Sequence, residues 1–254
     1  MERTIFLCED TPEGIFTGVY DAWASRRGHS HVKLKLNQMD TLELFAEYVN
    51  VASDAEKAEK VRRSIQRKIG IQAWQAVYRS VLSREESKAD DIYRFLVGGF
   101  YYGPQVMGML AEPAVMRIVE LDRAVANEAH YYKEFLRFSE SGSENRILCA
   151  KIRPKNQVLP LVAHHFAQRL SGENFLILDV GRGLASLHPA GRDWILAELT
   201  PAQAEAVPDT GGDDYGELWR TFFQSIAIRQ RENSGLQRGN LPLRYREFMN
   251  EFEI

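Results

Sequence analysis

The chain has 254 residues, 44% of them hydrophobic, so it can bury a core without covalent staples. A net charge of −3 gives no global attraction for nucleic acid, so affinity for a polyanion must come from local Lys and Arg clusters. The two cysteines, Cys8 and Cys149, form no CxxC pair, which argues against a disulfide framework and favours a cytoplasmic protein. The apolar run near the N-terminus is too short for a membrane span or a signal sequence, so no membrane partner is expected.

The first predicted elements are a short strand over Thr4–Cys8 and a helix after it. That helix begins in the Asp10–Glu13 run, which supplies a cap and a proline in the first turn. His31–Leu36 alternates like a half-buried strand. Ser53–Glu56 is typical of a capping box and predicts a helix that ends at Gly70. The Lys and Arg side chains of this helix have Glu56 and Glu59 as local partners and predict a solvated face.

The middle of the chain changes from helical to strand-like patterns. Helices are predicted over Ile71–Leu82, Ser87–Tyr102 and from Pro113 to about Tyr131, which makes the N-terminal half helix-rich. Phe135–Phe138 and Ile147–Ile152 then flank a Ser-Gly-rich turn and predict a hairpin. Further predictions are a helix over 158–170 and a strand over 175–179. We therefore expect an α+β fold with a helix-rich N-terminal half, a central antiparallel hairpin or sheet and a helical C-terminal segment.

Domain organisation is predicted from one break in the pattern. Val207–Asp214 combines Pro, Gly and Asp without apolar periodicity, so it is the strongest linker candidate. We expect a single compact unit over 1–254, with lobes at 1–131 and 132–206 and a helical segment at 213–254.

The C-terminal segment combines an apolar face with an arginine-rich flank. In a helix that starts near Asp213, a set of apolar residues shares one face and is expected to be core: Tyr215, Leu218, Trp219, Phe222, Phe223 and Ile226. Arg220 and Arg231 lie on a common flank, and Asn233, Gln237 and Arg238 follow. Guanidinium groups with interspersed amides suit phosphate recognition. The alternative is that the arginines pair with acids and orient the helix.

Three residues are candidates for acid–base chemistry, and each also has a structural interpretation. His165 with Arg169 can form a catalytic or phosphate-contacting face, or His165 can be a half-buried structural histidine. Asp179, at a strand end beside Arg182, can be catalytic or can cap a turn. Glu128 fits a general acid or an internal ion pair. No phosphate loop, HExxH, GxSxG or deaminase pattern occurs, so no cofactor or metal is predicted.

Several segments together resemble an uncharacterised bacterial family described as DNA-metabolism proteins, and the resemblance spans nearly the whole chain. The matching residues are Val125–His130, Phe135–Phe138, Val158–Leu161, His165, Phe166, Arg169, Ile177–Asp179, Arg182, Leu218–Arg220, Ile226–Ile228, Arg231, Asn233, Gln237, Pro242 and Tyr245. Members occur beside a radical-SAM protein linked to DNA repair, or fused to a uracil-DNA-glycosylase-like domain. The resemblance therefore implies DNA processing and a radical-SAM partner. Tyr131 and Glu134 depart from the family pattern, which has a basic residue and a glycine there.

Three functions follow as hypotheses. The first is a DNA-binding accessory protein in repair or modification, acting with a partner enzyme. Its predicted DNA contacts are Arg137, His165, Arg169, Arg182, Arg220, Arg231, Asn233, Gln237 and Arg238. The second is a DNA-processing enzyme that uses His165, Asp179 and Glu128 as acid and base. The third is a structural adaptor whose arginines form internal ion pairs.

Overall fold

The structure is a computed structural model that describes residues 3–37, 43–141, 146–208, 218, 221–222, 225 and 234–252. The chain divides into two compact units, Met1–Ala126 and Asn127–Ile254. The first lobe is predicted to end at residue 131, and the observed division falls at Ala126. Helices combined with a mixed sheet confirm the predicted α+β class. No helix among the described residues is long and apolar enough to cross a membrane.

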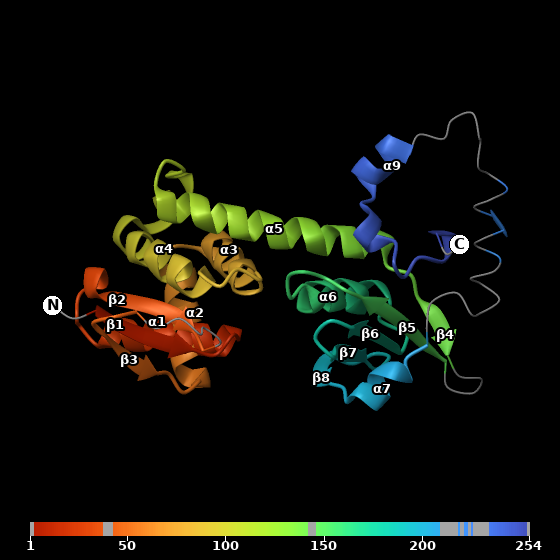
Figure 1. The fold of residues 1–254 in the computed structure, drawn as a ribbon, viewed down its shortest axis with the longest axis horizontal. Coiled ribbons are helices and arrows are strands. Elements are labelled where there is room, and N and C mark those ends of the chain that lie inside the picture. The colour runs from red at the N-terminus through yellow and green to blue at the C-terminus, as the bar shows by residue number, and fades with distance from the viewer. Residues whose placement is uncertain are drawn as a thin grey trace. The chain divides into compact units, whose positions relative to one another are not determined.

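The first unit is built around a small parallel sheet (Figure 1). Its elements are β1 (Arg3–Cys8), α1 (Pro12–Ala24), the 3-10 helix η1 (His29–His31), β2 (Val32–Leu36), β3 (Ala46–Asn50), α2 (Ala55–Lys68), α3 (Ile71–Val81), α4 (Lys88–Tyr102), η2 (Gly103–Gly108) and the start of α5 (Pro113–Phe135). Strand β1 pairs in parallel with both neighbours, in the order β2-β1-β3. Helix α1 packs directly on β1. The approach is so close that a Cβ at Gly18 would collide with the Cys8 sulfur, so this position requires glycine.

The helix starts of the first unit follow their capping residues. The Thr11 hydroxyl accepts a hydrogen bond from Gly14 N (2.9 Å), with Pro12 in the first turn, as the sequence predicts. The capping-box prediction for α2 is wrong by one residue, because Asp54 accepts from Glu56 N (2.9 Å) and Lys57 N (3.1 Å). The Ser53 hydroxyl instead donates to Glu9 (2.6 Å), so Ser53 is drawn to the end of β1 and the helix starts after it.

The second unit contains a five-stranded mixed sheet in the order β4-β5-β6-β7-β8. Its elements are the end of α5, β4 (Ser139–Ser141), β5 (Ile147–Ile152), α6 (Leu159–Arg169), β6 (Phe175–Asp179), β7 (Leu184–His188), β8 (Ile195–Glu198), α7 (Pro201–Glu205), α9 (Ser234–Asn240), η4 (Leu243–Tyr245) and η5 (Asn250–Phe252). Strands β5 and β6 are parallel and α6 connects them, while the other pairs are antiparallel. The carboxyl ends of β5 and β6 therefore lie at the same edge of the sheet.

The central hairpin forms with a different first strand from the one predicted. Helix α5 continues to Phe135, and the strand opposite β5 is Ser139–Ser141. Phe138 is a core contact instead, since its ring meets Phe166 and Phe175 edge-on, with centroids 5.0 and 6.0 Å apart. Phe138 is therefore apolar because it packs in the core, and not because it belongs to a paired strand.

The predicted C-terminal helix lies mostly outside the described residues. Two members of its expected core face are described, and they are exposed: Leu218 by 65% and Phe222 by 51%. The expectation of burial is therefore wrong for these two residues. Periodicity shows which side chains share a face, but not whether another element covers that face.

Helix α6 matches its prediction closely and positions the site described next. Leu159, Val162, Ala163 and Phe166 are buried at helical spacing, and α6 packs on β6 and β7. The opposite side presents His164, Gln168 and Arg169 to solvent. Packing thus leaves the polar face of α6 accessible.

Candidate nucleic-acid interface

Glu128 is an anchor for the loop that follows β5. Its carboxylate is only 2% exposed, and its Oε1 accepts a hydrogen bond from Lys155 N (2.9 Å). Oε2 accepts from both the backbone N (2.8 Å) and the side-chain Nδ2 (2.7 Å) of Asn156. Arg244 Nη1 lies 3.3 Å from Oε1. These contacts give Glu128 a structural role at this loop.

Asp179 holds the neighbouring turn and, through Arg182, the same loop. The Asp179 side chain is fully buried, and its Oδ1 accepts from Gly181 N (3.0 Å) and Arg182 N (3.3 Å), which is the turn-capping arrangement. Arg182 Nη1 donates to Oδ2 (2.9 Å) and to Pro154 O (3.2 Å), and Nη2 donates to Lys155 O (2.7 Å). Burial raises the pKa of Asp179, and the Arg182 charge opposes that rise. We call Glu128, Asp179 and Arg182 the loop clamp.

Most other predicted arginine contacts are internal or lie outside the described residues. Arg137 Nη2 donates to Glu251 Oε1 (2.7 Å), a carboxylate that is 3% exposed. Arg220, Arg231 and Asn233 fall outside the described residues. Gln237 and Arg238 are exposed on α9. The nine predicted contacts therefore do not form one described surface.

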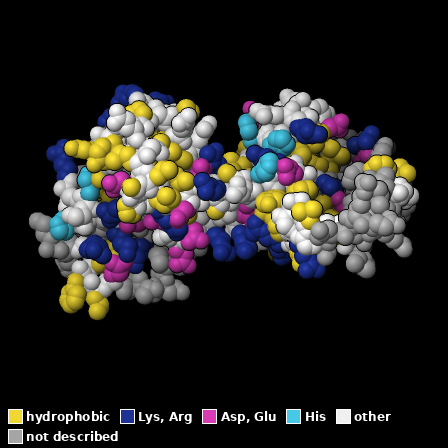
Figure 2. All heavy atoms as spheres, turned by 90° about the horizontal axis from the view of Figure 1, so that it is seen from above, with side chains coloured by type: hydrophobic (Ala, Val, Ile, Leu, Met, Phe, Trp, Pro, Cys, Tyr) yellow, Lys and Arg dark blue, Asp and Glu magenta, His cyan; other side chains and the backbone are white. Residues whose placement is uncertain are grey.

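His165 and Arg169 do come together, on the side of α6 near the end of α5. Burial lowers the pKa of His165, and the charges of Lys133, Arg169 and His164 lower it further. Lys133 and Arg169 therefore place positive charge near the half-buried imidazole. Figure 2 shows histidine side chains gathered on the second unit next to Lys and Arg side chains. We call Lys133, His164, His165 and Arg169 the α6 cationic face.

A groove adjoins this face on the other side of α6. Its volume is about 690 Å³, and it is lined by His164, Ala167, Gln168, Ser171, His188, Gly191, Arg192, Asp193 and Trp194. Arg192 and Trp194 belong to the turn between β7 and β8 and escape prediction from the sequence. The sequence signal that could have pointed to them is a tryptophan directly after a polar Gly-Arg-Asp run, since an indole combines an apolar ring with a polar N–H.

The three acid–base candidates do not form one site. Among the described residues, no hydrogen bond or ion pair joins His165 to Glu128 or to Asp179. Glu128 accepts hydrogen bonds from Asn156, and Asp179 accepts one from Arg182. His165 instead contacts the Phe166 ring, with centroids 5.0 Å apart. In the part of the chain that is described, no three His, Cys, Asp or Glu side chains gather in a way that would hold a metal ion.

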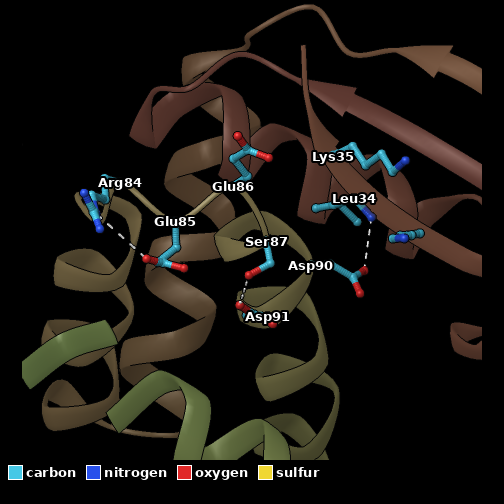
Figure 3. A pocket seen from close by; sticks show the side chains of 9 residues that line it. Leu34, Lys35, Arg84, Glu85, Glu86, Ser87, Asp90 and Asp91 are labelled. Carbon is cyan, nitrogen blue, oxygen red and sulfur yellow. Dashed lines mark hydrogen bonds and ion pairs between the residues drawn. The ribbon is translucent and has the colours of Figure 1, made fainter. Parts of the chain in front are cut away.

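A cavity of about 610 Å³ in the first unit is lined by residues of both charges (Figure 3). Asp90 Oδ1 accepts from Leu34 N (3.1 Å), and Ser87 Oγ donates to Asp91 (2.7 Å). Arg84 lies 4.0 Å from Glu85. Lys33 and Lys35 pair with Glu43, which is outside the lining, and four carboxylates face three cations in the lining, so this cavity has no net preference for an anion.

The fold and surface define an α+β protein of two compact units with an exposed cationic face beside an open groove. The chain belongs to the DUF4130 family, described as a domain of unknown function, whose model matches residues 86–251. That range contains the α6 cationic face, the groove and the loop clamp, while strands β1 to β3 precede it. No curated protein matches the chain. A solved structure described as a DHH-domain member of the S1p family of ribosomal proteins is similar over 73% of each chain, with 9% identity and a TM-score of 0.36.

Proposed function

We propose that this protein binds DNA through the α6 cationic face and the adjoining groove, as an accessory to a DNA repair or modification enzyme. The observation that carries the proposal is the junction of two features at His164. One is the placement of Lys133 and Arg169 beside His165, whose pKa is lowered by burial and then by these charges, and the other is a groove with Arg192 and Trp194. The cations can contact DNA phosphates, and the groove with its tryptophan can contact bases.

The electrostatics support a local site on an otherwise slightly acidic protein. A net charge of −3 repels a polyanion weakly at long range, so binding must rely on short-range contacts within a Debye length of about 8 Å. Arg169 and Arg192 are exposed, and Lys133 is half-buried. Unlike Arg137 and Arg182, Arg169 and Arg192 make no ion pair with a described residue.

The groove favours single-stranded over double-stranded DNA. An indole presents a flat face on which any base can stack, and stacking requires bases that are not already enclosed in a duplex. Gln168 supplies an amide on the same groove, and amides contact backbone or base edges. We therefore propose a single strand, with its phosphates toward Lys133, Arg169 and Arg192.

The partner in this proposal is a radical-SAM protein, as the family resemblance implies. An accessory role agrees with the separation of His165 from the two buried carboxylates. The protein would hold the strand while the partner carries out the reaction.

Fluorescence anisotropy with labelled single- and double-stranded oligonucleotides tests the proposal. Three phosphate contacts on a single strand predict that log K falls with log salt with a slope of about −2. Arg169→Ala and Arg192→Ala should each weaken binding. Arg63→Ala is the matched control, because this exposed arginine lies on α2 in the first unit. Absence of binding at low salt contradicts the proposal.

The structural-adaptor hypothesis is supported by two observations, the Arg137–Glu251 and Arg182–Asp179 ion pairs. In that case the arginines maintain the fold, and the partner alone contacts DNA. Anisotropy separates the two functions, since an adaptor shows no DNA binding while it still associates with its partner.

A further inference from the structure

A separate cavity of about 370 Å³ lies in the first unit between α1, α2 and α4. Val19 and Val61 contribute buried apolar surface, and Tyr20, Trp23 and Phe100 contribute aromatic rings. The Trp23 and Phe100 rings meet edge to face, with centroids 5.2 Å apart. The volume lies at the lower end of the range of small-molecule pockets.

Two lysines from one side of α2, Lys60 and Lys68, line the same cavity. Lys60 Nζ lies 5.9 Å from the centroid of the Tyr20 ring, and Lys68 Nζ lies 5.5 Å from that of Phe100. Lys60 is 3.9 Å from Glu56, a pair that is largely exposed and therefore weak. No carboxylate of a described residue lies within ion-pair distance of Lys68.

This combination differs from that of the paired-charge cavity of Figure 3. There, carboxylates line the cavity together with cations, whereas here both charged residues that line the cavity are cations beside aromatic rings. A neutral apolar ligand would leave the ammonium groups unused, and a small inorganic anion would leave the rings unused. The lining therefore suits a flat aromatic group that carries negative charge.

We infer that this cavity binds a nucleoside monophosphate, with its base among Tyr20, Trp23 and Phe100 and its phosphate at Lys60 and Lys68. The lysines suit a phosphate because each is a compact charge on a flexible stem that can follow the anion. The inference is independent of DNA binding by the second unit, because every lining residue precedes Ala126.

Isothermal titration of the full chain with adenosine 5′-monophosphate tests the inference, with adenosine and ribose 5-phosphate as separate arms. The nucleotide should bind more tightly than either fragment, since only it uses both the rings and the lysines. Lys68→Gln should weaken nucleotide binding by about tenfold, as expected for loss of a charged hydrogen bond. Lys60→Gln should act in the same direction. Arg63→Gln, an exposed change on the same helix outside the cavity, should have no effect.

The site of binding can be located with 5-fluorotryptophan, because the chain has four tryptophans and Trp23→Phe assigns the relevant resonance. The nucleotide should shift the Trp23 signal. A response at Trp194 alone would place binding in the α6 groove and overturn the inference while agreeing with the proposed DNA site. No binding at millimolar nucleotide, or equal binding of nucleotide and adenosine, also overturns it.

Discussion

The loop clamp and the α6 cationic face contain similar residue types but use them in opposite ways. In the loop clamp, Glu128 and Asp179 are buried. Glu128 accepts hydrogen bonds from Lys155 and Asn156, and Asp179 accepts them from Arg182 and from its own turn. On the α6 cationic face, Arg169 is exposed and helps to lower the pKa of a neighbouring histidine.

The difference lies in whether a carboxylate is brought within reach. An arginine that pairs with a buried acid uses its hydrogen-bond donors within the fold. An arginine without such a partner keeps its donors available for a ligand. Five substitutions test this comparison.

Glu128→Ala should have the largest effect, on stability. It leaves three donors of Lys155 and Asn156 without their buried acceptor and removes the partner of Arg244, so the free energy of unfolding should fall by about 3 kcal/mol. Chemical denaturation measures this. Glu120→Gln, on the exposed part of the same helix, should change stability by less than about 0.5 kcal/mol. Equal effects of the two changes would refute the structural role of Glu128.

Trp194→Ala should have the next largest effect, on DNA affinity. Loss of one stacking platform should weaken single-strand binding by about tenfold while it changes duplex binding much less. Trp194→Phe keeps a ring and should recover most of the affinity. If the alanine variant binds both forms of DNA as tightly as the wild type, the groove is not a base-contacting surface.

Arg169→Ala and Arg182→Ala separate the two regions directly. Loss of one single-strand phosphate contact reduces the salt slope by about 0.7, which corresponds to about fivefold in affinity at 0.1 M salt. Arg169→Ala should show this loss with unchanged stability. Arg182→Ala should lower the melting temperature, because it leaves Asp179 buried without its cation, and should keep the wild-type salt slope. A lower melting temperature in Arg169→Ala and a reduced salt slope in Arg182→Ala would contradict the assignment of the two arginines.

His165→Gln should have the smallest effect, seen in the pH dependence. The folded-state pKa of His165 is lowered, so below about pH 6.5 the unfolded chain binds more protons than the folded chain. His165 therefore lowers the free energy of unfolding at acid pH and leaves it unchanged above that range. A bound phosphate favours the imidazolium, so DNA affinity should rise as pH falls through the same range. Anisotropy from pH 7.5 to 5.5 should show a shallower rise in His165→Gln. An identical rise in both proteins would show that His165 does not cause it.

Local pattern predicts much of the fold. The periods of 2 and 3.6 residues locate β1, β2, α2, α6 and β6, since each depends on which side chains share a face of one element. The same pattern misplaces the strand before β5. Phe138 looks like part of a strand in the sequence, but its ring packs against Phe166 and Phe175. Those contacts join segments that are distant in the chain.

The candidate site is less predictable for the same reason. His165 and Arg169 are four residues apart on one helix, so their proximity follows from the sequence alone. Arg192 and Trp194 join them only because β7 and the turn after it pack beside α6.

By itself, the sequence determines the α+β class, the positions of most helices and the polar side of α6. The tertiary structure decides which charged residues remain available, since Arg137 meets Glu251 and Arg182 meets the loop after β5 across long stretches of chain. Helical and strand periodicity depends on neighbours within a few residues, whereas the exposure of a charge depends on which distant carboxylate packing brings to it.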